Sequence, residues 1–125
     1  MIRDALLCFE KVSKIYRKKN LEIKALSDVS FFVETGEFVS IIGKSGCGKS
    51  TLLNLAGGLD HASLGQIFFE STNFAKMKRD QLAAYRLNSV GFVFQSFNLI
   101  NSQSALENVS LPMIFSGYPR RQREK

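Results

Sequence analysis

The sequence predicts an α/β fold with a parallel core, because short apolar runs alternate with helical patterns along the chain. Residues 38–42 form a mostly apolar run that is typical of a strand buried on both faces. A glycine-rich turn follows, and residues 52–56 then show a helical pattern that stops at a pair of glycines. A second helical pattern at residues 79–87 precedes a second apolar run at residues 90–94. We expect both apolar runs to be buried strands.

Further strands are predicted near the N-terminus and in the middle of the chain. Residues 6–12, 25–33 and 66–69 are rich in apolar side chains. In the second of these segments, Val29 and Phe31 share one parity with other apolar residues, and this alternation suits a half-buried sheet.

The C-terminal third predicts two further helices. Ser104 and Glu107 have the spacing of a capping box, which opens a helix. We expect Pro112 to end or kink that helix, because proline lacks the N–H of the helical hydrogen bond. Pro119 stands where a new helix would begin. Because the chain stops six residues later, we expect it to be cut short.

Composition allows one domain at most and points to a reducing cytoplasm. The chain has 125 residues, 45% of them apolar, and a formal net charge of +6. Its two cysteines, Cys8 and Cys47, fit neither a disulfide framework nor a paired metal motif. The basic residues cluster near both ends, and we interpret them as solvated surface. Aromatic residues are not interleaved with them, so we expect no nucleic-acid partner.

Residues 43–50 match the phosphate-loop pattern G-x-x-x-x-G-K-[ST]. Its glycines let several backbone N–H groups turn toward one phosphate, and the following helix adds partial positive charge. Lys49 can reach the β- and γ-phosphates, and Ser50 can bind Mg²⁺. A chance match is the alternative, expected in fewer than about one in a hundred chains of this length. The predicted ATP-binding residues of the loop are Gly43, Ser45, Gly46, Cys47, Gly48, Lys49, Ser50 and Thr51.

The motifs around the loop select among the protein classes that share it. A GTPase would show N-K-x-D, which is absent. Residues 25–38, 43–54 and 91–99 instead resemble the lead-in, the Walker A loop and the Q-loop of ABC transporter ATP-binding subunits. Residues 105–112 are similar to the subgroup that serves lipoprotein release, macrolide efflux and cell division. The resemblance implies a P-loop NTPase core with parallel strands and an N-terminal antiparallel β subdomain, truncated before Walker B.

The resemblance also implies roles for two residues outside the loop. Tyr16 would be the aromatic residue that stacks on adenine, an interaction worth roughly 1–3 kcal/mol. The alternative is an ordinary strand-edge tyrosine. Gln95 would be catalytic, touching Mg²⁺ or the attacking water, and the alternative is a turn residue. The implied metal ligands are therefore Ser50 and Gln95.

Three motifs of the family do not occur in residues 1–125, which we expect to form a partial ATP-binding domain. Walker B, with its Asp-Glu pair, the signature Leu-Ser-Gly-Gly-Gln and the switch histidine are absent. His61 follows the loop helix, and we expect it to be a surface residue. Phosphoryl transfer needs the lysine, the metal and a placed water together. We therefore expect the chain to bind nucleotide weakly and to hydrolyse little or none.

The predicted function is that of an ATP-binding subunit that couples ATP binding and hydrolysis to transport. Its implied partners are a transmembrane permease and a second ATP-binding subunit, and its implied location is the cytoplasmic face of the cell membrane. Residues 96–118 are the candidate contact surface, with ordinary core as the alternative. Two other functions remain open: a non-catalytic nucleotide-binding remnant or pseudogene product, and a phosphate-loop kinase, for which neither an acceptor site nor a lid is found.

Overall fold

A computed structural model of the chain describes residues 5–19 and 21–123. The ends of the predicted domain, residues 1–4 and 124–125, and residue 20 lie outside the described residues. In chain order the elements are β1 (Ala5–Lys18), β2 (Leu21–Glu34), α1 (Lys49–Ala56), β3 (Leu64–Phe69), β4 (Thr72–Asn73), the 3-10 turn η1 (Phe74–Lys76), α2 (Arg79–Ser89), α3 (Ala105–Phe115) and α4 (Arg120–Arg123). None of the described helices has the length and apolar character needed to cross a bilayer.

The sheet is antiparallel and has four strands in the order β2-β1-β3-β4. β1 pairs with β2 along its whole length, from Ala5 opposite Glu34 to Lys18 opposite Leu21. Its pairing with β3 ends at Ser13, so among the described residues β2 is the only strand that pairs with the last part of β1. The three strands expected at residues 6–12, 25–33 and 66–69 are confirmed, and so is the antiparallel subdomain.

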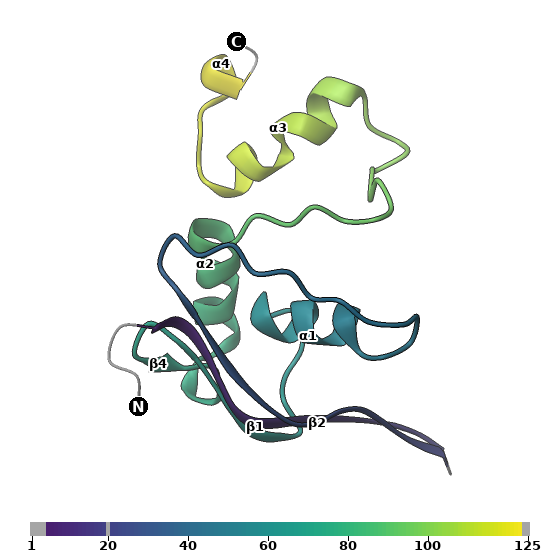
Figure 1. The fold of residues 1–125 in the computed structure, drawn as a ribbon. Helices are drawn as coiled ribbons and strands as arrows, with labels where there is room; N and C mark the ends of the chain where they lie inside the picture. The colour runs from purple at the N-terminus through teal and green to yellow at the C-terminus, as the bar shows by residue number, and fades with distance from the viewer. Residues whose placement is uncertain (1–4, 20, 124–125) are drawn as a thin grey trace.

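The core lies between this sheet and the helices α1 and α2, which Figure 1 shows on one side of it. Apolar side chains from β1, β2 and β3 meet side chains from both helices there. The expected half-burial of Val29 and Phe31 is confirmed, and the Phe31 ring stacks on Phe9 at 4.6 Å between centroids. The buried cluster consists of Phe9, Val12, Leu26, Leu55, Ile67, Phe74, Leu82 and Tyr85.

The two segments expected to be buried strands of a parallel core differ from that expectation. Residues 38–42 and 90–94 form no regular strand, and Phe38, Ile42 and Val93 are 93%, 91% and 102% exposed. A strand needs a neighbour to receive its backbone hydrogen bonds. Among the described residues no strand pairs with either segment, so both remain open apolar chain.

The helices follow their local signals, with one exception. Ser104 caps α3: its backbone N–H donates to Glu107 Oε2 at 2.8 Å, and the Glu107 N–H donates to Ser104 Oγ at 3.3 Å. α4 follows Pro119 as expected. Pro112, however, lies inside α3, which continues to Phe115. Of the two expected effects, an end of the helix at Pro112 is wrong, whereas a kink there stays a prediction. One lost N–H bond does not prevent the next turn, where the Ser116 N–H donates to the Pro112 carbonyl at 3.0 Å.

α3 and α4 form a pair that stands apart from the sheet in Figure 1, joined to α2 by a long connection. Much of the apolar surface of this part is open: Phe97, Val109 and Phe115 are 92%, 75% and 71% exposed. Ser110 is the buried residue of α3. The segment 96–118 is therefore not ordinary core within the described part of the chain.

Candidate nucleotide-binding site

The predicted phosphate loop, residues 43–48, leads directly into α1. Gly48 is the N-cap residue of the helix and has φ of +97°, and Gly46 has φ of +79°. These left-handed conformations favour glycine. The first helical hydrogen bond runs from the Leu52 N–H to the Gly48 carbonyl at 2.9 Å. The backbone N–H groups that precede it have no partner within the helix and are available to an anion.

Lys49 folds its ammonium back onto the loop. Its Nζ donates to the carbonyls of Gly43 and Lys44, each at 2.8 Å, and lies 3.7 Å from Cys47 Sγ. The loop therefore encircles a positive charge that is only half-buried. Phosphate oxygens are stronger acceptors for an ammonium than neutral carbonyls, and they could take the place of these carbonyls.

At two glycines of the loop an added Cβ would collide with a neighbour, which is backbone at Gly48 and the end of the Cys47 side chain at Gly43. A Cβ at Gly48 would lie 2.5 Å from the Ala25 carbonyl oxygen on β2 and 2.9 Å from Leu26 Cδ2. A Cβ at Gly43 would lie 2.6 Å from Cys47 Sγ. The loop thus packs tightly against β2 at one end and onto itself at the other. This cradle, together with Lys49, fits a bound phosphate group.

Hydroxyl groups border the loop on the helix side. Ser50 is exposed, Thr51 is half-buried, and neither side chain forms a hydrogen bond within the described residues. Ser50 is therefore available as a ligand for Mg²⁺. No group of three or more His, Cys, Asp or Glu side chains in the described part of the chain could hold a metal by itself. A metal here would need oxygen ligands from the phosphates and water in addition to Ser50.

Gln95 lies in an exposed bend after residues 90–94. The segment before it packs against the far end of α1, since a Cβ at Gly57 would lie 2.0 Å from Phe92 Cζ. The phosphate loop lies at the opposite end of α1. Among the described residues, no hydrogen bond joins Gln95 to the phosphate loop. The catalytic role of Gln95 therefore stays a prediction.

Tyr16 lies on the part of β1 that pairs only with β2, opposite Ile23. The residue is 39% exposed, and its hydroxyl donates to Asp60 Oδ2 at 2.9 Å. The Lys14 ammonium lies 4.8 Å from the ring centroid and forms an ion pair with Asp60 Oδ1 at 2.6 Å. Tyr16 is thus part of a polar cluster with Lys14 and Asp60, which sequence reasoning missed.

A signal for half of this cluster was present in the sequence. Lys14 and Tyr16 are two residues apart on one strand, so their side chains share a face. No comparable local signal indicates Asp60, which lies 44 residues from Tyr16. His61, expected at the surface, is exposed, and its carbonyl accepts a hydrogen bond from Lys14 Nζ at 2.8 Å.

The surroundings of Asp60 favour its charged form. Partial burial raises the pKa of this carboxyl, but hydrogen bonds from Lys14, the His61 N–H and Tyr16, together with the charge of Lys14, outweigh the burial. The net pKa of Asp60 is therefore lowered from its ordinary value of 3.8. At neutral pH it is a carboxylate that accepts all three hydrogen bonds.

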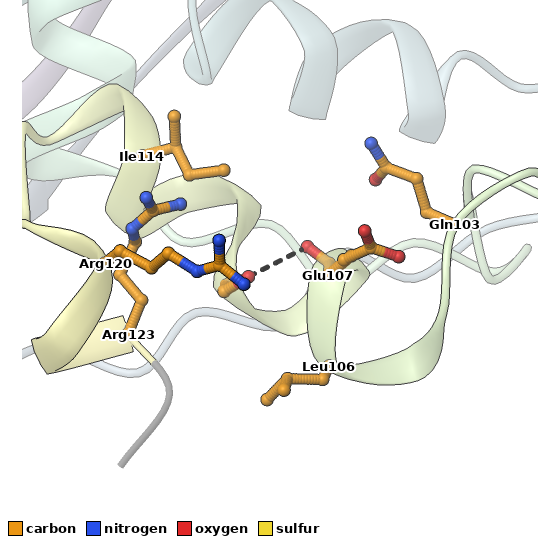
Figure 2. A pocket seen from close by; sticks show the side chains of 7 residues that line it. Gln103, Leu106, Glu107, Ile114, Arg120 and Arg123 are labelled. Atoms are coloured by element: carbon orange, nitrogen blue, oxygen red, sulfur yellow. Dashed lines mark hydrogen bonds between the residues drawn. The ribbon is translucent and has the colours of Figure 1, made fainter.

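A hollow between α3 and α4, shown in Figure 2, is separate from this site. Within it the Ser110 hydroxyl donates to the Glu107 carbonyl at 3.2 Å. It contains none of the predicted nucleotide-binding residues and belongs instead to the candidate contact segment. Its lining consists of Gln103, Leu106, Glu107, Ser110, Ile114, Arg120 and Arg123.

Comparison with known proteins identifies relatives that cover most of the chain. The profile of the ABC transporter family matches residues 26–125. The lipoprotein-releasing system ATP-binding protein LolD of Idiomarina loihiensis is 43% identical over 91% of this chain and 50% of its own length. The macrolide export ATP-binding/permease protein MacB of Hyphomonas neptunium is 44% identical over 90% of this chain and 17% of its own length.

A solved structure shows the same fold. The ATP-binding cassette MJ0796, a dimer bound to ADP and Pi in a post-hydrolysis state, is 40% identical and superposes with a TM-score of 0.86 over 94% of this chain and 52% of its own. The expected resemblance and fold class are therefore confirmed. The chain spans about half the length of LolD and of this cassette.

Proposed function

This chain belongs to the ABC transporter family, and from that premise we propose that it supplies the nucleotide-binding half of an ATP-binding subunit. The subunit would couple ATP binding and hydrolysis to transport by a membrane partner. The observation that supports this most directly is the phosphate loop, in which Lys49 lies within a cradle of glycine backbone at the start of α1. Such a loop binds the β- and γ-phosphates of a nucleoside triphosphate.

Each predicted residue has a stated task in this proposal. Lys49 would exchange its two carbonyl partners for phosphate oxygens, and Thr51 would donate near the α-phosphate. Ser50 and Gln95 are the residues that would hold Mg²⁺, which supplies charge that neutralises the phosphates. Tyr16 would stack on the adenine base. The loop backbone of Ser45, Gly46 and Cys47 would orient the phosphates.

Replacing the loop lysine tests the proposal. Lys49→Ala removes a charged hydrogen bond worth roughly 1.5–3 kcal/mol, so ATP affinity should fall by about tenfold to a hundredfold. Isothermal titration of the purified chain with MgATP measures this. Lys76→Ala is the matched control, because Lys76 is an exposed lysine of η1 outside the site. Equal affinity of the Lys49→Ala variant and the unchanged chain would show that the loop is not the site.

We further propose two protein partners, a transmembrane permease and a second ATP-binding subunit, at the cytoplasmic face of a membrane. The first is supported by LolD, an ATP-binding protein of a lipoprotein-releasing system, and by MacB, an ATP-binding/permease protein of macrolide export. The dimeric state of the cassette MJ0796 supports the second. Exposed apolar side chains in the segment 96–118, among them Phe97 and Phe115, supply a surface suited to the permease. Pull-down with the permease of the source cell, lost on Phe97→Asp with Phe115→Asp, would support this contact.

A further inference from the structure

We propose that Asp60 is a positioning residue that holds the Tyr16 ring in the orientation required to stack on a purine base. This inference rests on the proposed function, because it concerns the base-binding side of the same nucleotide site. It assigns to one carboxylate, outside every motif of the loop, a share of the affinity for the base and none of the affinity for the triphosphate.

The carboxylate of Asp60 holds the tyrosine through both of its oxygen atoms. Oδ2 accepts the hydrogen bond from the Tyr16 hydroxyl at 2.9 Å and so fixes the far end of the ring. Oδ1 binds the Lys14 ammonium at 2.6 Å, and that ammonium lies 4.8 Å from the ring centroid. The ring is therefore restrained at its tip and over one face by groups that share a single carboxylate.

Lys14 is itself immobilised, which distinguishes this cluster from a surface ion pair. Lys14 is 9% exposed, and its ammonium also donates to the His61 carbonyl at 2.8 Å. Long charged side chains in water lose much of the value of such contacts to entropy and screening. Here the cation is fixed over one face of the ring, so a base would stack on the opposite face. Tyr16 as a whole is 39% exposed, so the residue is accessible from solvent.

The position of Asp60 is set by the end of α1. The Tyr85 hydroxyl of α2 donates to the Ala56 carbonyl at 2.8 Å, and Arg86 donates to the Gly58 carbonyl at 2.8 Å. These bonds satisfy carbonyls at a helix end that would otherwise lack partners. Asp60 follows two residues later and is therefore anchored to a helix whose other end begins at Lys49.

This anchoring joins the two halves of the proposed nucleotide site. One rigid helix of eight residues, about 12 Å long, carries the phosphate-binding lysine at its start and leads to the carboxylate that holds the base-stacking ring. Loss of the carboxylate would leave the phosphate loop intact and free the ring. The effect of such a change should therefore depend on whether the ligand has a base.

The experiment compares ATP with inorganic tripolyphosphate, each with Mg²⁺, by titration of the 125-residue chain. In the Asp60→Asn variant, ATP should bind about three- to tenfold more weakly, and tripolyphosphate should bind as it does to the unchanged chain. Tyr16→Phe removes only the hydroxyl that donates to Asp60, and it should weaken ATP by about twofold to fivefold. This second variant tests the same hydrogen bond from the side of its donor.

A tyrosine-free background separates positioning from general stability. In Tyr16→Ala, the further change Asp60→Asn should leave ATP affinity unaltered, because no ring remains to be held. Glu22→Gln is the matched control: it converts a carboxylate to an amide near the same end of the sheet, where Glu22 pairs only with exposed Arg17 at 3.4 Å. Glu22→Gln should change neither the affinity for ATP nor the affinity for tripolyphosphate.

The outcomes distinguish this proposal from the proposed function. If Asp60→Asn weakens ATP and tripolyphosphate equally, or weakens ATP in the Tyr16→Ala background as well, the carboxylate is merely structural and the positioning role is wrong. If ATP binding depends on Lys49 but not on Asp60 or the Tyr16 hydroxyl, only the positioning role is lost. If the unchanged chain binds neither ligand, the proposed function fails and takes this inference with it.

Discussion

At the scale of single residues, the phosphate loop is defined by where a side chain cannot go. Gly48 combines a φ of +97° with a carbonyl oxygen 2.5 Å from the place of a Cβ, whereas Gly36 has a φ of +80° and open space around it. Both glycines avoid the strain of a left-handed conformation. Only Gly48 also lets the loop approach β2 closely. A side chain added at Gly36 would therefore cause backbone strain alone, whereas one added at Gly48 would cause both strain and a steric clash.

We expect Gly48→Ala to lower both stability and ATP affinity. Strain at a left-handed position costs about 1–2 kcal/mol, and the contact with the Ala25 carbonyl would add to it by pushing the loop off β2. Gly36→Ala should cost the strain alone and leave ATP affinity unchanged. Chemical denaturation and ATP titration of both variants measure the difference. Equal loss of affinity in the two would mean that the packing of the loop on β2 does not shape the site.

Single residues also show what sequence can and cannot reveal. The loop from Gly43 to Ser50 was predictable because its chemistry lies within eight consecutive residues. The hydrogen bond of Asp60 to Tyr16 was not, because it joins positions 44 residues apart on different elements. A carboxylate that follows a helix can have many hydrogen-bond partners. Only the folded position of β1 shows that Asp60 accepts from Tyr16.

At the scale of elements, the local signals for where helices begin were reliable, whereas Pro112 did not mark the end of α3 and two expected strands did not form. α3 begins at Ser104 because the Ser104–Glu107 capping box is complete within four residues. The apolar runs 38–42 and 90–94 were expected to be strands on composition alone. Strand formation depends on a neighbouring strand that no local pattern guarantees. The fold of the N-terminal sheet could be predicted because β1, β2 and β3 supply neighbours for one another.

The cap of α3 should be measurable on its own. Ser104→Ala removes the side chain that accepts from the Glu107 N–H, a loss of about 1 kcal/mol in helix stability. Because α3 has few buried residues, the loss should appear as faster amide exchange in its first turn, by about fivefold, with α1 unaffected. Ser102→Ala, two residues earlier in an exposed turn, is the control. Unchanged exchange in Ser104→Ala would show that the capping box does not stabilise this helix.

At the scale of the whole molecule, the exposed apolar segments and the greater length of the relatives both indicate that these segments form an interface with another part of a longer domain. Residues 38–42 and 90–94 are open where a neighbouring strand would cover them, and the chain spans 50% of LolD. Contiguous apolar surface of this kind is typical of an interface rather than of free surface. The Walker B carboxylates and the switch histidine, which the resemblance implies for catalysis, do not occur in residues 1–125. We therefore expect strand formation by these two segments and catalysis to depend on the part of the relatives that this chain does not match.

A chimera tests this dependence directly. Joining the 125 residues to the remaining half of LolD from Idiomarina loihiensis should bury residues 38–42 and 90–94 as strands, seen as slower amide exchange, and should give ATP turnover. The chain alone should turn over ATP no faster than its Lys49→Ala variant, because lysine, metal and a placed water must act together. The chimera with Lys49→Ala is the matched control and should be inactive. Turnover by the chain alone above its Lys49→Ala variant would contradict the expectation, since these residues would then activate water unaided. Turnover by the chimera without protection of the two segments would separate catalysis from completion of the core.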